Sequence, residues 1–223
     1  MKKTLSLISI LFTIISSLFA TDISDFINIY KCDQVIDKQI YTVCYSYKYK
    51  GALGGWTILD GNKVNAVNIK KRPRFYENKT IPKKYRTKYR DYTGMGRTWN
   101  RGHFIVADAD ADYSKESLHL VYDMSQIQPQ ASKVNQKTWL KVERYGRMLA
   151  VKLGYVHSIS IADYRGATKK LKNNVIIPRG FYRIYYNDNA NFKKCFYYRN
   201  DIFVDWKHDT LKKHLVDCNK IIY

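Results

Sequence analysis

The chain has 223 residues, of which 45% are hydrophobic and 15% aromatic, and its 39 Lys and Arg against 19 Asp and Glu give a formal net charge of +20. This length and composition fit a domain with a substantial core, and they exclude a low-complexity or repeat protein because the sequence has no repeat of fixed period and no Pro-, Gly- or Ser-rich linker. Positive charge of this size attracts polyanions and speeds their encounter with the protein.

The N-terminal residues predict a secretory signal peptide. Lys2 and Lys3 precede an almost unbroken apolar run over residues 5–15, and small residues follow up to position 20. Such a run is too short for a stable membrane span and is typical of a cleaved export signal. We therefore expect 1–20 to be removed and 21–223 to form a single domain, secreted or periplasmic, with a net charge of +18 after loss of the two lysines. No later apolar run is long enough to predict a membrane span.

Eight short runs of apolar residues, most of them rich in β-branched and aromatic side chains, predict strands or extended segments. In chain order they are 40–50, 55–59, 66–69, 104–107, 118–124, 156–161, 174–177 and 181–186. Residues 51–55 predict a turn, and the basic, Pro-containing residues 70–97 predict a long irregular surface segment. Residues 196–206 fit neither helix nor strand alone, and 210–218 predict a short terminal helix.

Residues 136–153 have the clearest helical pattern. Apolar side chains recur there at spacings of three and four and form one stripe, made of Trp139, Val142, Tyr145, Leu149 and Leu153. Gly154 follows as a C-cap. Together with the strands, this helix predicts an α+β fold with a central antiparallel sheet and flanking helices.

Four cysteines in an exported chain indicate two disulfides. Three pairings are possible, and we prefer Cys32–Cys44 with Cys195–Cys218 because these close the shortest loops. No CxxC spacing occurs, which disfavours a metal site built from cysteines.

Basic residues are interleaved with aromatic ones, most densely in the stretch KKYRTKYR at 83–90. Cations contact phosphates and exposed rings stack on bases, so this composition favours a nucleic-acid ligand. A solubilising surface, or attraction to acidic lipids or glycans, is the alternative explanation.

Three polar residues have a placement that suggests chemistry. His103 is one of five histidines and follows Arg101 and Gly102 at the start of a short apolar run. Asn135 stands at the entrance of the predicted helix, and Glu143 is the only acid in it and borders its apolar stripe. A core histidine, an N-cap and an internal ion pair are the ordinary explanations. Phosphodiester hydrolysis would use all three, because imidazole accepts a proton near neutral pH and Mg²⁺ prefers oxygen ligands.

The spacing of these residues resembles a known family. The residues that match its motif are Asn100-Arg101-Gly102-His103, Pro129-Gln130, Asn135, Trp139 and Glu143. Together with DYTG at 91–94, they make the segment 91–147 similar to the DNA/RNA non-specific endonucleases, which are ββα-metal or His-Me finger nucleases.

The resemblance implies a Mg²⁺-dependent endonuclease that hydrolyses DNA and also RNA to 5′-phosphate ends, with Mn²⁺ as a substitute metal. It makes His103 the general base and Asn135 the metal ligand, with Glu143 acting on the metal through water. Phosphate contacts are assigned to three arginines, Arg74, Arg101 and Arg147. DNA and RNA are then the expected partners, and the oligomeric state stays open, with a homodimer as one option.

Three positions depart from the family pattern. Asn100, Gln126 and Lys137 replace an acid, an asparagine and a glycine. The base, the ligand and the acid are retained, which favours an enzyme. The alternative is a non-catalytic basic protein on the same fold that binds nucleic acid for uptake or adhesion.

Asp108, Asp110 and Asp112 have the spacing that begins a calcium-binding loop. The remaining positions of that loop do not follow, since Tyr113 stands where a glycine is required and His119 where a glutamate is required. We therefore expect a capping or structural role for these carboxylates.

Overall fold

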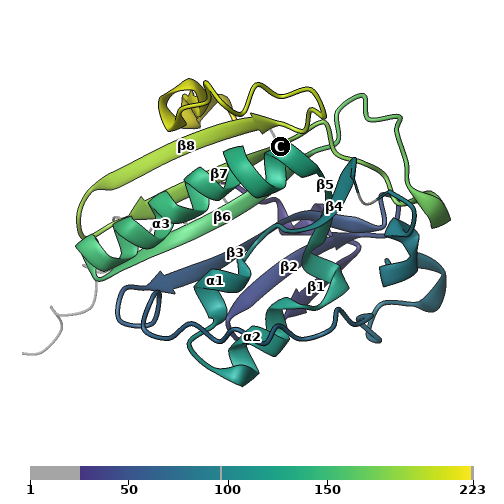
Figure 1. Cartoon of the computed structure of the whole chain (residues 1–223), viewed down its shortest axis with the longest axis horizontal. Helices are drawn as coiled ribbons and strands as arrows, with labels where there is room; N and C mark the ends of the chain where they lie inside the picture. The colour runs from purple at the N-terminus through teal and green to yellow at the C-terminus, as the bar shows by residue number, and fades with distance from the viewer. Residues whose placement is uncertain (1–25, 96, 222–223) are drawn as a thin grey trace, which may run out of the picture.

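The structure is a computed structural model and describes residues 26–95 and 97–221 (Figure 1). The predicted signal peptide, 1–20, lies outside the described residues. The strands in the described part of the chain are β1 (Gln34–Asp37), β2 (Tyr41–Ser46), β3 (Gly51–Asp60), β4 (Trp99–His103), β5 (Ile127–Ala131), β6 (Tyr155–Asp163), β7 (Gly180–Asn187), β8 (Phe192–Arg199) and β9 (Leu215–Val216). They form a seven-stranded sheet in the order β1-β2-β3-β6-β7-β8-β9 and a two-stranded sheet of β4 and β5. Neighbouring strands are antiparallel in both sheets.

The clearest strand predictions are confirmed. Residues 156–161 and 181–186 lie inside β6 and β7, and most of 40–50 lies in β2. The turn predicted at 51–55 is wrong, because β3 begins at Gly51 and pairs with β2 through these residues. A Cβ on Gly55 would collide with the Ile105 side chain and the Thr42 carbonyl. These glycines therefore permit a close approach of the chain that follows β4 rather than a turn.

The strand predictions around the β4–β5 sheet are partly wrong. Residues 104–107 are buried but irregular and lead into α1 (Asp108–Ala111), and most of 118–124 belongs to α2 (Lys115–Val121). Short apolar runs do not distinguish a buried strand from a buried helix. For residues 118–124, Ser114 favours the helix because it is the N-cap of α2: its Oγ accepts a hydrogen bond of 3.0 Å from the Ser117 N–H.

Four further segments differ from expectation or are resolved by the structure. Residues 66–69 are irregular, and 174–177 contribute only an isolated bridge although Val175 and Ile177 are buried in a small apolar cluster. Their burial explains the apolar pattern without strand pairing. The ambiguous segment 196–206 is the end of β8 followed by a loop, and 210–218 form a short 3-10 turn and β9 instead of a helix.

The predicted long helix is confirmed as α3 (Trp139–Leu153), and it ends at Gly154 with φ of 85°. A π-turn, Val134–Thr138, precedes it without interruption. Single π-turns within helices occur frequently at functional sites. Tyr185 of β7 donates a 3.0 Å hydrogen bond to the Val142 carbonyl and so holds α3 against the sheet.

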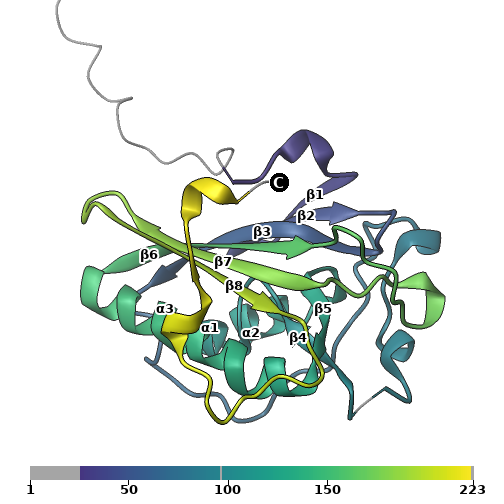
Figure 2. The same ribbon diagram turned by 90° about the horizontal axis from the view of Figure 1, so that it is seen from above.

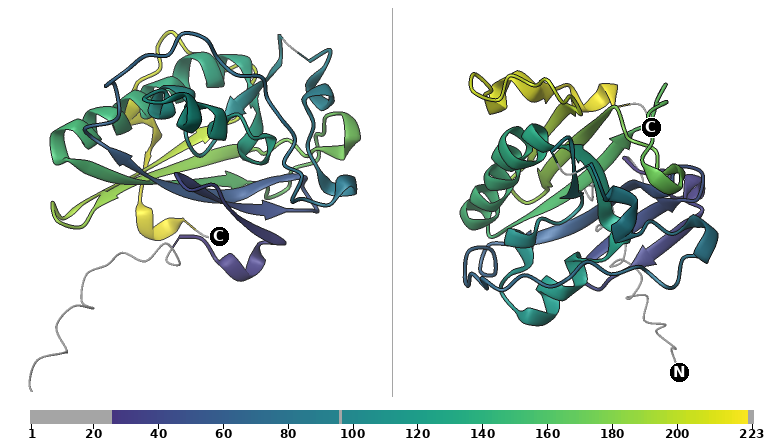
Figure 3. Two further views of the ribbon diagram at one scale, coloured as in Figure 1. Left: turned by 90° about the horizontal axis from the view of Figure 1, so that it is seen from below. Right: turned by 45° about the vertical axis from the view of Figure 1, so that its right-hand side comes forward.

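The helices α1, α2 and α3 and the β4–β5 sheet cover one face of the large sheet. The N-terminal 3-10 turn (Ile29–Lys31) and the last 3-10 turn (Cys218–Lys220) lie on the other face (Figure 2). The views from below and from the side show the same layers (Figure 3). In the part of the chain that the structure describes, no helix has the length and apolarity that a membrane crossing requires.

Two disulfides hold the ends of the chain to the large sheet. Cys32–Cys44 joins the N-terminal segment to β2 with 5.1 Å between the Cα atoms, and Cys195–Cys218 joins β8 to the C-terminal segment with 5.4 Å. These two disulfides are the short-loop pairing that the sequence favoured.

Removal of either disulfide is expected to destabilise the protein. The loops span 12 and 23 residues, and loop-closure entropy assigns about 3 kcal/mol to each of them. The double variants Cys32→Ser/Cys44→Ser and Cys195→Ser/Cys218→Ser should each lower the free energy of unfolding by about this amount in urea titrations. An unchanged midpoint in both would contradict the expectation.

Candidate active site

β4 places three candidate residues on one face. Side chains alternate along a strand, so Trp99, Arg101 and His103 point to one side and Asn100 and Gly102 to the other. Asn100 accepts a 2.9 Å hydrogen bond from Ser132 Oγ. The substitution of the family's acid at position 100 therefore lies on the face opposite His103.

His103 is enclosed by aromatic rings. Its ring lies 4.9 Å from that of Tyr122 and 5.6 Å from that of Phe75, centroid to centroid. His103 Nε2 is buried and has no hydrogen-bond partner among the described residues. Burial lowers the pKa of His103 to about 4, against the opposing effect of Asp108. The ring is therefore neutral at pH 7, and no described protein group bonds to its Nε2.

The chain directly after His103 is held by buried side chains. Gln126 accepts hydrogen bonds from the Ile105 and Val106 N–H groups and donates one to the Val121 carbonyl. The family's more common asparagine is one methylene shorter, so Gln126 fills this position with a longer reach. The departure at 126 is thus structurally accommodated.

Arg183 holds the same segment from the large sheet. Its guanidinium donates hydrogen bonds of 2.9 Å to the carbonyls of Phe104 and Ile105, and it lies 4.8 Å from the Trp139 ring centroid. Arg183 is 1% exposed. Arg183 was not among the residues predicted from the sequence; a lone arginine inside the apolar run 181–186 was the signal that could have found it.

Arg101 and Arg74 line one pocket beside His103. The pocket has a volume of about 670 Å³ and is lined by Arg72, Pro73, Arg74, Phe75, Tyr89, Arg101 and Tyr122. The Arg101 guanidinium stacks 3.7 Å from the Tyr89 ring centroid, and its buried Nε has no hydrogen-bond partner among the described residues. Arg74 is exposed at the rim. The pocket therefore presents cations where an anionic ligand would approach His103.

Glu143 and Arg147 form a buried charged group with α1. Arg147 makes a 2.6 Å ion pair with Asp110, whereas Glu143 makes no hydrogen bond to any described residue. Burial, together with the nearby Asp110 carboxylate, raises the pKa of Glu143 to about 8. Arg147 is thus engaged inside the protein, and its phosphate contact stays a prediction.

The three aspartates of the possible calcium loop are bound by arginines. Arg72 contacts Asp108 at 3.3 Å and Asp112 at 3.2 Å, and Asp110 pairs with Arg147. Asp110 Oδ2 also accepts a 3.3 Å hydrogen bond from the Ala107 N–H at the start of α1. The capping and structural role fits these contacts. Across 26–95 and 97–221, no group of three or more His, Cys, Asp and Glu side chains is arranged to hold a metal ion.

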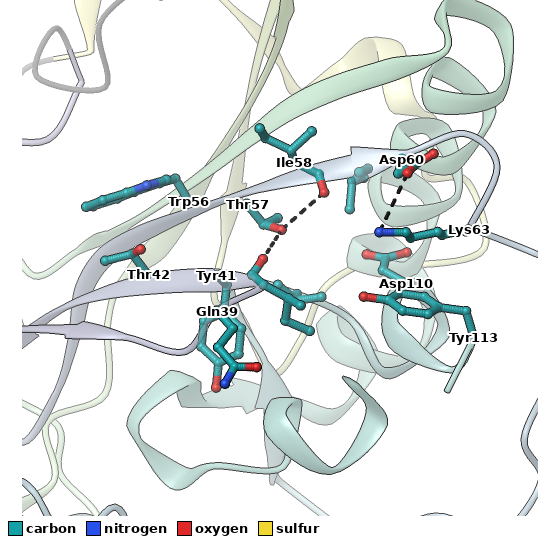
Figure 4. Close-up of a pocket in the computed structure, with 13 residues that line it drawn as sticks. Gln39, Tyr41, Thr42, Trp56, Thr57, Ile58, Asp60, Lys63, Asp110 and Tyr113 are labelled. Carbon is teal, nitrogen blue, oxygen red and sulfur yellow. Dashed lines mark hydrogen bonds and ion pairs between the residues drawn. The ribbon is translucent and has the colours of Figure 1, made fainter. Parts of the chain in front are cut away.

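Another cavity, of about 320 Å³, has Asp110 in its lining (Figure 4). Lys63, Asp60 and Tyr113 stand at its edge, and Thr57 donates a 2.7 Å hydrogen bond to the Ile40 carbonyl within it. One lysine against two carboxylates makes it a poor site for a polyanion, so the pocket at Arg101 is the candidate for substrate.

Asn135 lies within the π-turn rather than at a helix N-cap. It is half-buried, and its side chain makes no hydrogen bond to another described residue. Lys137 on the same turn is exposed, 5.1 Å from the Trp206 ring centroid. The Asn135 amide oxygen is therefore free of competing protein donors.

Residues 23–221 match the family model described as DNA/RNA non-specific endonuclease. The chain belongs to this family. It is 25% identical to mitochondrial endonuclease G of Homo sapiens over 164 residues, which are 68% of this chain and 54% of that protein. It is 24% identical to nuclease C1 of Cunninghamella echinulata var. echinulata over 167 residues, which cover 67% and 63% of the two chains. The mitochondrial nuclease of Saccharomyces cerevisiae is 33% identical over 126 residues, covering 56% and 37%.

The fold is similar to that in the crystal structure of the EndoG/EndoGI complex, with a TM-score of 0.73 at 18% identity over 89% of this chain and 87% of that one. The predicted fold class, a ββα-metal nuclease fold with a central antiparallel sheet, is confirmed by this match. The aligned regions span between about a third and two thirds of the length of the three relatives. All the candidate residues from Arg74 to Arg147 lie inside the segment that matches the family model.

The raised pKa of Glu143 predicts a pH-dependent stability in metal-free buffer. Its pKa is 4.5 in the unfolded chain and about 8 in the fold, so the folded protein binds more protons between these values. Stability must then fall as pH rises from 4.5 and level off above 8. Gln does not titrate, so the melting temperature of Glu143→Gln minus that of the wild type should increase over this range in EDTA. A difference that does not change with pH would show that Glu143 ionises normally.

Proposed function

We propose that the protein is a metal-dependent endonuclease that hydrolyses phosphodiester bonds of DNA and RNA without sequence preference. The observation that carries the proposal is the neutral, buried His103, whose Nε2 lacks a hydrogen-bond partner in the described chain. Its ring packs against Phe75 and Tyr122, which line the same pocket as Arg74 and Arg101. A base and cations around one cavity suit an anionic ester. Membership of the family supports the same assignment.

The residues present fit a magnesium ion. Mg²⁺ prefers oxygen ligands and retains most of its waters, so one protein ligand is sufficient. The Asn135 amide oxygen makes no hydrogen bond to a described residue, and neither does the buried Glu143 carboxyl. Asn135 would hold the ion and Glu143 would contact it through water. The bound ion would neutralise negative charge that develops on the phosphate.

The protein's own side chains would act on the water and on the phosphate. His103 Nε2 accepts a proton from the attacking water, because the ring is neutral at working pH. Arg101 and Arg74 bind the phosphate oxygens, a contact that guanidinium groups make with two parallel hydrogen bonds. The new bond joins the water oxygen to phosphorus and the P–O3′ bond breaks. O3′ leaves as a 3′-hydroxyl after it takes a proton from solvent water, and the phosphate stays on the 5′ oxygen, which yields a 5′-phosphate end.

We propose that the protein acts outside the cytoplasm, as a secreted or periplasmic enzyme. Two disulfides support this location, because such bonds persist in oxidising compartments. The predicted signal peptide at 1–20 is consistent with it.

Replacement of His103 separates the enzyme from a binding protein. His103→Ala should fold and bind DNA in EDTA as the wild type does, and lose about 10²–10⁴-fold in cleavage rate with Mg²⁺ because the general base is absent. His119→Ala is the matched control, since His119 is exposed on α2, outside the Arg101 pocket. Cleavage that survives in His103→Ala would refute the mechanism. Binding without any cleavage by the wild type would favour the non-catalytic alternative.

Replacement of Asn135 tests the metal ligand. Asn135→Ala should lose most activity and require more Mg²⁺, with an unchanged melting temperature in EDTA. Gln136→Ala is its control, because Gln136 is exposed on the same π-turn. A magnesium titration of both variants measures the effect, and equal midpoints would remove Asn135 from the metal site.

A further inference from the structure

A further pocket, separate from the two described above, lies at the other end of β4 from His103. It has a volume of about 550 Å³ and is lined by Trp99, Gly166, Ala167, Thr168, Lys169, Ile177, Pro178, Arg179, Tyr197, Arg199, Asn200, Asp201, Ile202 and Phe203. Trp99 is on the same face of β4 as Arg101 and His103. The four residue steps from Trp99 to His103 correspond to about 13 Å of strand, which is about four stacked nucleotides of one strand.

The pocket is rigidly connected to the active site. Asn200 is buried and accepts a 2.7 Å hydrogen bond from the Ala131 N–H, and it donates one of 2.8 Å to the Pro129 carbonyl. Both partners lie on β5, which pairs with β4. The Asn200 N–H donates to the Arg179 carbonyl at 2.8 Å. The floor of the pocket is therefore bonded to the strands that carry His103.

The rim of this pocket combines cations with an exposed ring. Lys169, Arg179 and Arg199 are exposed, and the acid in the lining, Asp201, lies 3.9 Å from Arg199. Phe203 is 87% exposed. A phenyl ring has no polar group that could hydrogen-bond to a base edge, but its face can stack on any unpaired base. Bases in a duplex are already stacked on one another and do not offer such a face.

The same loop reaches the metal-ligand side of the active site. Trp206, three residues after Phe203, lies 5.3 Å from Lys133 Nζ and 5.1 Å from Lys137 Nζ, measured to the ring centroid. Lys133 directly precedes the π-turn that contains Asn135, and Lys137 lies within that turn. The segment after β8 starts beside β4 and β5 (Figure 2). Aromatic rings and cations thus continue from the pocket to the turn that contains Asn135.

We propose that the pocket at Trp99 and Phe203 binds a single-stranded stretch of the nucleic-acid substrate beside the bond that is cleaved. Phe203 stacks on an unpaired base, and Arg179 and Arg199 bind the adjacent phosphates. The subsite makes the protein prefer unpaired over fully paired substrate. This inference rests on the proposed function for its substrate.

Binding in EDTA tests the subsite apart from cleavage. Fluorescence anisotropy with a single-stranded 12-mer and with a fully paired hairpin of the same composition gives two dissociation constants, and their ratio measures the preference. Phe203→Ser should reduce the preference for the single strand at least about fivefold, the effect of losing one stacking contact. Phe203→Tyr should retain it, because the ring face is kept. Arg199→Gln should weaken binding and lessen its dependence on salt.

Tyr30→Ser is the matched control, since Tyr30 is 93% exposed at the N-terminal 3-10 turn, away from β4. It should leave both constants unchanged. An equal loss in Tyr30→Ser and Phe203→Ser, or an unchanged ratio in Phe203→Ser, overturns the subsite. A Phe203→Ser protein that changes its oligomeric state in sedimentation, with the ratio intact, assigns the ring to a protein contact and also overturns it.

The same assay separates the two proposals. A wild-type protein that prefers the single strand through Phe203 but does not cleave with Mg²⁺ retains the subsite and loses the proposed function. A wild-type protein that cleaves, with a ratio insensitive to Phe203, retains the function and loses the subsite.

Discussion

The buried guanidinium of Arg183 joins the three parts of the fold that define the site. It bonds to the carbonyls that follow His103, to Ser158 Oγ on β6, and stacks on Trp139 at the start of α3. A buried arginine is unfavourable unless its donors are satisfied, and carbonyl groups of an irregular segment have no strand partners of their own. The two terminal NH2 groups of Arg183 therefore satisfy these carbonyls and are satisfied by them, whereas its Nε has no hydrogen-bond partner among the described residues. The position of His103 relative to the large sheet and α3 depends on this exchange.

Burial shifts the pKa values of His103 and Glu143 in opposite directions. His103 is neutral because desolvation lowers its pKa, and Glu143 retains a proton because desolvation and Asp110 raise its pKa. Ion pairs with Arg72 and Arg147 occupy the neighbouring aspartates. His103 and Glu143 are therefore both uncharged at neutral pH, within a protein of high positive charge. The excess of surface cations is left to attract the polyanion.

Much of the site was predictable because its residues follow one another at short intervals. The apolar stripe of α3 placed Glu143 beside the buried side of the helix. The strand face that Arg101 and His103 share was not predicted, because the predicted strand began at 104 whereas β4 ends at His103. Asn135 and Glu143 belong to one continuous helical segment. The contribution of Arg183 was not predictable, because it comes from β7, far along the chain, and only the packing of the sheet brings it to Phe104.

The sequence by itself determined the elements with regular periodicity: α3, β6 and β7. It also favoured the short-loop disulfides, because a chain brings nearby cysteines together at low entropic cost, and the structure decided among the three possible pairings. Only the tertiary structure decided that 118–124 is mostly helix, since an apolar run is buried equally well in either form and Ser114 selects the helix. Only the tertiary structure brought Trp99, Arg199 and Phe203 around one pocket, because their contact depends on Asn200 bonding β5 across a separation of about seventy residues.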